Sequence, residues 1–158
     1  MTHPLFDLSN KTALITGSSQ GIGYTLAAGL ASAGATIVVN GRDAAKLTAA
    51  ADRMRDGGAT VHELVFDVTD HHACRAAVDG FESTIGAIDI LVNNAGMQHR
   101  TALEDFPIEM FEKLMATNVT SVFSVGQAVA RHMIARGAGK IINIASVQTA
   151  LARPGIAP

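Results

Sequence analysis

A glycine-rich stretch near the amino terminus holds the first residues whose spacing indicates chemistry. The stretch reads TGSSQGIG at residues 16–23, and its glycines are Gly17, Gly21 and Gly23. Glycine allows positive φ angles and close approach of a phosphate to the backbone, and the start of a helix offers free N–H groups to an anion. A strand-like run precedes the stretch and a helix-like run follows it, which predicts a phosphate-binding loop. An ordinary glycine-rich turn is the alternative, because the spacing differs from the G-x-G-x-x-G fingerprint of dinucleotide-binding loops.

Polar residues also stand where other apolar runs end. Arg42 follows VVNG, Asp67 follows VHELVF, NNAG occupies residues 93–96, and Ser146 follows KIINIA. In open parallel sheets, ligands bind in the crevice outside the carboxyl ends of the strands. These residues are therefore candidates for the same site as the glycine-rich stretch.

The adjacent pair His71-His72 follows Asp70 and raises the question of a metal site. Adjacent residues on a helix point in different directions, so the pattern favours an exposed helix start over a zinc site. We expect no metal.

The elements that must position these residues alternate along the chain. Short runs rich in Val, Ile and Leu predict strands buried on both faces at residues 12–16, 36–40, 61–66, 88–93 and 140–145. Between them, apolar stripes with helical spacing stand at residues 22, 26, 30 and 33, then 74, 77, 78, 81 and 85, and lastly 119, 122, 125, 129 and 133. An Ala-rich stretch at residues 44–55 predicts an outer helix, Asp70 is a candidate N-cap, and Gly34 ends the first helix. This β-α-β-α-β-α-β-α-β order predicts an α/β fold, a doubly wound parallel sheet of Rossmann-like type, in a single domain.

Composition excludes several classes of function. Hydrophobic residues make up 48% of the 158 residues and charged residues 16%, which is typical of a globular domain rather than a disordered chain. The net charge of −2, without a basic run, argues against nucleic acid as a partner. The apolar runs are too short for a membrane span, and no secretory signal pattern opens the chain. The single cysteine, Cys74, fits a cytoplasmic location.

The motifs and their order are similar to those of the short-chain dehydrogenase/reductase family, and the resemblance extends from about Leu8 to Pro158. TGSSQGIG resembles the family's nucleotide-binding motif, and NNAG resembles its second motif, at the end of the fourth strand. Asn118-Val119 resembles the region of the catalytic asparagine, and IASVQ the strand that delivers the catalytic serine. The stretches LVNNAGMQHR and QAVARHMIARGAGKIINIASVQ look most like the gluconate 5-dehydrogenases within the family. That resemblance implies a sugar acid as substrate, D-gluconate or 5-keto-D-gluconate.

The resemblance also implies a nicotinamide cofactor. The expected cofactor contacts are Gly17, Ser19, Gln20, Gly21, Ile22, Gly23, Asn40, Arg42, Asp67, Val68, Asn94, Ala95 and Gly96. An acidic residue at the end of the second strand selects NAD(H) by binding the ribose 2′-OH, whereas an arginine accommodates a 2′-phosphate. Gly41 stands where the acid is expected and Arg42 follows, which favours NADP(H), with NAD(H) as the alternative. The alternatives to these cofactor contacts are that Arg42 is a solvated surface residue and that Asp67 is only a loop carboxylate before the next helix.

In the family, a tyrosine acts as general acid/base, a lysine four residues later lowers its pKa, a serine bonds the substrate oxygen, and an asparagine supports a proton relay. Ser146 matches the serine and Asn118 the asparagine, so both are predicted catalytic residues. The sole tyrosine, Tyr24, has Ala28 four residues later and cannot supply the Tyr-x-x-x-Lys motif. The family's usual interval places that motif just after Pro158, so we expect a domain that is incomplete at its carboxyl end and inactive by itself. A non-catalytic nucleotide-binding module is the alternative.

Further expectations concern the substrate and the truncated edge. Arg100 is a candidate ligand for the carboxylate of a sugar acid, against the alternative of a solvated loop arginine. His99 could also lie at the rim of the site. By resemblance, the five strands take the spatial order 3-2-1-4-5 and the fifth becomes an exposed apolar edge. The family also builds a dimer interface around the helix of residues 119–133, so the full-length protein is expected to be a homo-oligomer.

Overall fold

The sheet has the predicted parallel order. A computed structural model describes residues 4–147 and 151 of the chain. Its strands are β1 (Thr12–Ile15), β2 (Thr36–Gly41), β3 (Val61–Val65), β4 (Ile90–Asn93) and β5 (Lys140–Asn143). They pair in parallel throughout, in the order β3-β2-β1-β4-β5. This confirms the doubly wound α/β fold, and each predicted strand lies within two residues of its expected limits.

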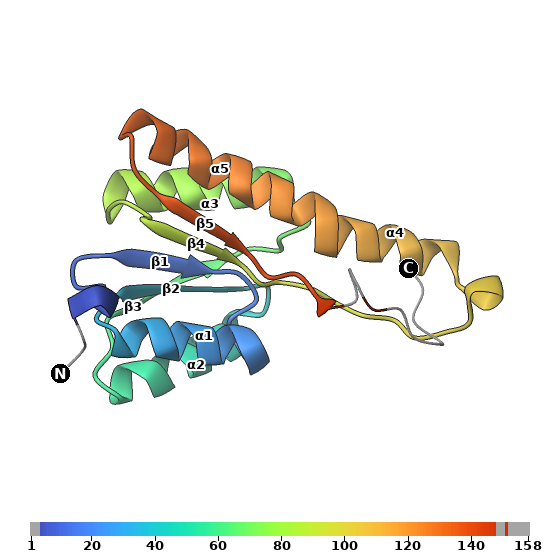
Figure 1. The fold of residues 1–158 in the computed structure, drawn as a ribbon, viewed down its shortest axis with the longest axis horizontal. Coiled ribbons are helices and arrows are strands. Elements are labelled where there is room, and N and C mark those ends of the chain that lie inside the picture. The colour runs from blue at the N-terminus through green and yellow to red at the C-terminus, as the bar shows by residue number, and fades with distance from the viewer. Residues whose placement is uncertain (1–3, 148–150, 152–158) are drawn as a thin grey trace.

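Helices cover both faces of the sheet (Figure 1). α1 (Gly21–Ser32) and α2 (Ala44–Asp56) lie on one face, and α3 (His71–Thr84) and α5 (Ser121–Ala135) lie on the other. The Asp70 carboxylate accepts a hydrogen bond from the Ala73 N–H, which confirms the predicted cap of α3. Asp43 caps α2 in the same way through the N–H of Lys46.

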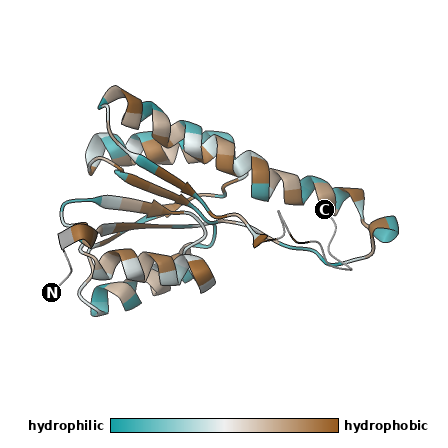
Figure 2. Ribbon diagram, in the orientation of Figure 1, coloured by the Kyte–Doolittle hydropathy of each residue, from teal (hydrophilic) through white to brown (hydrophobic). Residues whose placement is uncertain are grey.

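The strand residues alternate between two apolar cores, as period-2 side-chain geometry requires. Leu14 and Val38 pack with α3 and α5 in one core, which also contains Val78 and Val125. Ala13, Ile15, Ile37 and Val39 point to the other face and pack with Ala27 of α1 and Leu47 of α2. Figure 2 shows that the strands are largely hydrophobic and that the helices around them carry both hydrophobic and hydrophilic residues. Burial on both faces explains the continuous apolar runs of β1, β2 and β4.

Two helix predictions were wrong in detail. Ile22 was expected on the buried face of the first helix, but its side chain is 70% exposed, while Gly23 and Ala27 face the sheet. The last helical stretch is much longer than its stripe indicated. It comprises α4 (Ile108–Met115), a π-helical turn η3 (Ala116–Thr120) and α5. Val119 of the predicted stripe lies in the π turn and is exposed, and Ile85 at the end of α3 is exposed too.

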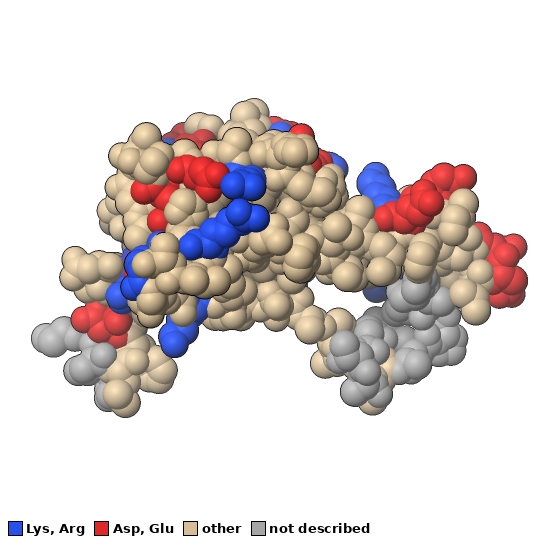
Figure 3. Space-filling view, turned by 90° about the horizontal axis from the view of Figure 1, so that it is seen from above, with Lys and Arg blue, Asp and Glu red and all other residues tan. Residues whose placement is uncertain are grey.

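α4 and the short helix η2 (Leu103–Asp105) project beyond the carboxyl ends of the strands (Figure 1). Figure 3 shows acidic side chains on this projecting end, where Glu104, Asp105 and Glu109 belong to η2 and α4. A short helix η1 (Pro4–Phe6) lies at the opposite end of the described chain.

β5 forms one edge of the described sheet, and every residue of the strand is exposed. Ile141 and Ile142 are 42% and 47% exposed. The prediction of an exposed apolar edge is confirmed. Among the described helices, none is long and apolar enough to cross a membrane.

Candidate functional site

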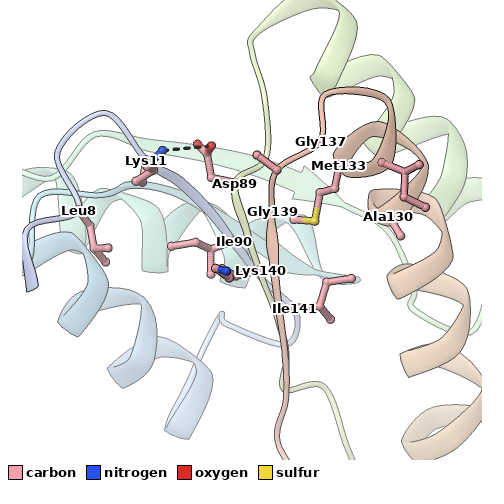
Figure 4. Close-up of a pocket in the computed structure, with 12 residues that line it drawn as sticks. Leu8, Lys11, Asp89, Ile90, Ala130, Met133, Gly137, Gly139, Lys140 and Ile141 are labelled. Atoms are coloured by element: carbon pink, nitrogen blue, oxygen red, sulfur yellow. Dashed lines mark ion pairs between the residues drawn. The ribbon is translucent and has the colours of Figure 1, made fainter.

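The predicted site lies at the carboxyl ends of the strands, whereas a pocket lies at their other end. A pocket of about 700 Å³ is bordered by Lys11, Asp89 and Lys140, which stand at the starts of β1, β4 and β5 (Figure 4). Its walls are apolar side chains such as Ile90 and Met133, and the Lys11 ammonium lies 3.7 Å from the Asp89 carboxylate. None of the predicted site residues lines this pocket.

The glycine-rich loop has the geometry of a phosphate cradle. Gly17 and Gly21 have φ of +64° and +58°, the region that glycine adopts without strain. No atom of the described structure lies within 4 Å of where a Cβ on Gly21 would stand, so the space in front of the loop is open. Gly23 is the opposite case, because a Cβ there would lie 2.5 Å from both Asn94 Nδ2 and the Gly17 carbonyl oxygen. The first N–H groups of α1 have no intrahelical acceptor, and Gln20 makes no side-chain cap.

Thr16 joins this loop to the NNAG segment. Its buried hydroxyl accepts hydrogen bonds from the N–H groups of Asn94 and Ala95, both at 2.9 Å. In return, Asn94 Nδ2 donates to the carbonyl oxygens of Thr16 and Gly17, at 2.9 and 3.4 Å. The two motifs, far apart in sequence, therefore form one rigid unit at the ends of β1 and β4.

Asn40 was predicted as a cofactor contact, and the structure buries it at 1% exposure. Its Oδ1 accepts from the Gly17 N–H at 3.3 Å, and its Nδ2 donates to the carbonyl oxygens of Leu64 and Phe66 at 3.0 and 3.2 Å. Its own N–H donates to Ser18 Oγ, which in turn donates to the Ile15 carbonyl oxygen. The Asn40 side chain thus holds the loop and the end of β3 from beneath, and a direct cofactor bond would cost one of these contacts.

Arg42 and Asp67 come together at the ends of β2 and β3. Arg42 Nη1 lies 3.5 Å from Asp67 Oδ2. The other carboxylate oxygen, Oδ1, accepts from the N–H and the hydroxyl of Thr69, at 2.9 and 2.7 Å. The backbone hydrogen bond from Thr69, with help from its hydroxyl and from Arg42, holds the pKa of Asp67 below its ordinary value. The neighbouring Val68, also a predicted cofactor contact, is 8% exposed and packs into a core.

Asn118 sits in the π turn η3, where the Ser121 N–H reaches back to the Ala116 carbonyl oxygen. Single π turns inside helices are frequent at functional sites. The Asn118 side chain makes two hydrogen bonds to the backbone of Met97, just after NNAG. Its Oδ1 accepts from the Met97 N–H at 2.8 Å and its Nδ2 donates to the Met97 carbonyl oxygen at 2.9 Å. The predicted catalytic asparagine and the predicted cofactor segment are thereby fixed to each other.

The remaining predicted residues follow β4 and β5 in the chain, beyond the carboxyl ends of these strands. Ser146 is exposed, three residues beyond the end of β5. Arg100 is exposed and donates to Gln98 Oε1 at 3.3 Å. The His99 ring packs edge-to-face on Phe106, with centroids 5.3 Å apart, which makes it a packed loop residue. Tyr24 lies on α1, and the Cζ atom of the Arg53 guanidinium stands 4.8 Å from the centre of the Tyr24 ring.

Sequence reasoning overlooked three residues that hold the site together. Thr16, Ser18 and Met97 act through hydroxyl or backbone hydrogen bonds to the predicted site residues. For Thr16 and Ser18 a signal existed, since a small hydroxyl residue at a strand end commonly bonds to nearby backbone. The described residues contain no group of three or more His, Cys, Asp or Glu side chains placed to hold a metal.

Known proteins are similar to this chain in sequence and in fold. The short chain dehydrogenase family matches residues 11–158. Gluconate 5-dehydrogenase of Gluconobacter oxydans (strain 621H) is 56% identical over 159 residues, covering 100% of this chain and 62% of that protein. 5-Keto-D-gluconate 5-reductase of Escherichia coli (strain K12) is 46% identical over 154 residues, covering 98% of this chain and 61% of that protein.

A solved structure agrees with both. The crystal structure of a gluconate 5-dehydrogenase from Burkholderia cenocepacia J2315, in complex with NADP and tartrate, superposes with a TM-score of 0.93 at 58% identity. The match covers 96% of this chain and 60% of that one. The chain spans about three fifths of the length of these relatives. On the match over residues 11–158 and the fold that carries the motifs, the chain belongs to the short-chain dehydrogenase family, and it is similar to members named gluconate 5-dehydrogenase.

Proposed function

We propose that this chain forms the cofactor-binding and substrate-orienting part of an NADP(H)-dependent oxidoreductase that interconverts D-gluconate and 5-keto-D-gluconate. The observation that carries the proposal is the unit formed by the glycine loop and NNAG, in which Thr16 and Asn94 exchange hydrogen bonds. The names of the relatives support the substrate, because one is a gluconate dehydrogenase and another reduces 5-keto-D-gluconate.

The loop fits a dinucleotide diphosphate. Open space in front of Gly21 admits the phosphates, and the free N–H groups at the start of α1 would bind them. Ser19, Gln20 and Ile22 flank that space on the loop, and Ala95 and Gly96 continue from the Thr16 contact along the same edge. When bound there, the nicotinamide ring supplies a hydride acceptor or donor.

NADP(H) is favoured by the charges at the end of β2. Gly41 presents no carboxylate to a 2′-phosphate, and the guanidinium of Arg42 is 74% exposed beside it. A planar guanidinium matches phosphate geometry with two parallel hydrogen bonds. The Burkholderia cenocepacia relative is described as an NADP complex, which agrees with this preference.

The chain's own side chains would orient the sugar acid. Ser146 would donate a hydrogen bond to the reacting oxygen, because its hydroxyl lies beyond β5 at the carboxyl edge of the sheet. Asn118, fixed to Met97, would hold the water that relays the proton. Arg100 would pair with the substrate carboxylate through a charge-assisted hydrogen bond.

Residues 1–158 by themselves are proposed to bind the cofactor without transferring hydride. General acid/base catalysis on a carbonyl needs a group with a tuned pKa within hydrogen-bond reach. Tyr24, the one tyrosine of the sequence, lies on α1, packs against Arg53 of α2 and has no lysine four residues later. A polypeptide of these 158 residues that turned over 5-keto-D-gluconate with NADPH would contradict this part of the proposal.

The test of the whole proposal is steady-state kinetics of the intact natural protein. D-Gluconate with NADP⁺ should be oxidised, and Arg100→Ala should raise KM for gluconate at least tenfold, on the order of one lost charged hydrogen bond of about 1.5–3 kcal/mol. KM for an uncharged polyol should change little. Arg75→Ala, on the exposed side of α3, is the matched control. Equal effects of Arg100→Ala on both substrates would show that Arg100 does not bind the carboxylate, and no turnover of gluconate would reject the proposed substrate.

We further propose that the intact protein assembles from copies of itself through α5. This helix leaves Phe123 and Ile134 69% and 78% exposed, an apolar surface that a partner helix would bury. Sedimentation of the intact protein should show a dimer or larger species, and a monomer at all concentrations would contradict it.

A further inference from the structure

The ends of β2 and β3 place one cation and one anion at the proposed cofactor site. Gly41 pairs with Val65 in the parallel ladder, and the Phe66 N–H donates to the Gly41 carbonyl oxygen at 3.2 Å. Arg42 follows Gly41 directly, and Asp67 stands two residues after Val65, so both side chains lie just beyond the carboxyl ends of these adjacent strands. This register produces the 3.5 Å approach of Arg42 Nη1 to Asp67 Oδ2.

Within the pair, Asp67 is held in place and Arg42 is free to move. Thr69 donates two hydrogen bonds to Asp67 Oδ1, which leaves Oδ2 directed at the arginine. The Asp67 side chain is 37% exposed, whereas that of Arg42 is 74% exposed. A long exposed arginine side chain exchanges rotamers readily, so it can leave the carboxylate for another anion.

We propose that Asp67 is a specificity-determining residue that competes with the cofactor's 2′-phosphate for Arg42 and so moderates the preference for NADP(H) over NAD(H). The inference rests on the proposed function, because it assumes that the nucleotide binds at this edge. It assigns to Asp67 a role separate from any contact with the adenine ring, which both cofactors share.

The physical reason is charge compensation. Without a ligand, the carboxylate neutralises the guanidinium at close range. A 2′-phosphate must then draw Arg42 away from Asp67 and accept a carboxylate as a near neighbour. A ribose 2′-OH carries no charge, so it neither needs to displace Arg42 nor is repelled by the carboxylate. An exposed pair contributes little, so removing the Asp67 charge should tighten binding of a 2′-phosphate by about two- to fivefold.

Asp67→Asn is the cleanest change, because the amide oxygen can still accept from Thr69 while the atom that faces Arg42 loses its charge. Asp43→Asn is the matched control. It removes one negative charge from the residue after Arg42, but Asp43 caps α2 and pairs with Lys46 at 3.7 Å. Asparagine is an equally good helix cap, so the control should fold normally.

The experiment is calorimetric binding of two probes to the intact protein. Adenosine 2′,5′-bisphosphate carries the 2′-phosphate, and 5′-AMP lacks it. We expect Asp67→Asn to bind the bisphosphate two- to fivefold more tightly at low salt with 5′-AMP unchanged, and Asp43→Asn to change the ratio of the two affinities by less. The gain should vanish at high salt, where charges are screened, and in the Arg42→Ala background, where no arginine remains to be released.

Other results would overturn the inference. Equal weakening of both probes in Asp67→Asn would assign Asp67 to the shared adenosine. A gain that persists without Arg42 would reduce the effect to general repulsion. An unchanged ratio, with both probes bound by the unaltered protein, would reject this inference and leave the cofactor proposal standing. Failure of the unaltered protein to bind either probe would reject both.

Discussion

Replacing Gly23 by alanine should loosen the unit formed by the glycine loop and NNAG. The new Cβ would lie 2.5 Å from Asn94 Nδ2 and from the Gly17 carbonyl oxygen, where ordinary contact begins at about 3.4 Å. The Gly17 oxygen is backbone and cannot swing away. Asn94 can yield only by weakening its hydrogen bonds to Thr16 and Gly17. Either response widens the gap between β1 and β4 at the place where the diphosphate is proposed to bind.

The size of the effect follows from three contributions. Overpacking costs about 1–3 kcal/mol, and loss of the 2.9 Å hydrogen bond from Asn94 costs about 0.5–1.5 kcal/mol. Alanine gains about 0.5–1 kcal/mol over glycine as a helical residue. The free energy of unfolding should therefore fall by about 0.5–4 kcal/mol.

Gly29 provides the internal control, because it lies on the same helix and nothing stands within 4 Å of its Cβ position. Gly29→Ala should raise the free energy of unfolding by about 0.5–1 kcal/mol. Urea denaturation followed by circular dichroism compares the two variants, and titration with NADPH reports the loss of binding. A Gly23→Ala protein as stable as Gly29→Ala, with unchanged NADPH affinity, would refute the steric reasoning.

Two further predictions use the same denaturation assay. Thr16→Val keeps the shape of the side chain but leaves two backbone N–H groups without their acceptor. It should therefore lower the free energy of unfolding by about 1–3 kcal/mol. The control Thr25→Val, on the exposed face of α1, should lower the free energy of unfolding by less than about 0.5 kcal/mol. The hydrogen bond to His132 at 2.7 Å, with smaller help from Arg75, holds the pKa of Asp79 below its ordinary value of 3.8. This contribution to stability is present above pH 3.8 and is lost as the pH falls through the lower folded-state pKa, so Asp79→Asn should destabilise the protein near pH 5 and have a smaller effect at strongly acidic pH. Solvent screens this exposed pair, which limits the difference to about 1 kcal/mol, and a penalty that grows on acidification would contradict the assignment.

β1, β2 and β4 were predictable because burial on both faces gives short continuous apolar runs. Their exact starts were not predictable. The run from Ile88 looks like strand, but the Ile88 N–H donates to Glu82 and its carbonyl oxygen accepts from Arg136, so side chains replace the ladder there and β4 begins at Ile90. Sequence periodicity cannot reveal that two side chains will satisfy a backbone group across the fold.

α4 escaped prediction for a related reason. The helix projects past the sheet and buries only Leu114, while Ile108 and Met115 are exposed, so its apolar residues follow no continuous buried stripe. The site shows the same limit. The glycines indicate the loop because their residue type and spacing are visible in the sequence. The pairing of Arg42 with Asp67 depends on strand register, which the sequence leaves undetermined.

The burial of Asn40 makes two properties of the proposed nucleotide site separable. One amide group beneath the surface fixes both the Gly17 N–H and the end of β3, and none of its hydrogen bonds involves residues 41–43. Substitutions at those three positions can therefore alter the charge presented to the ribose while the phosphate loop keeps its shape. Selectivity for one dinucleotide over another would then depend on exposed residues, and evolution or design could change it without altering the loop that is proposed to bind the diphosphate.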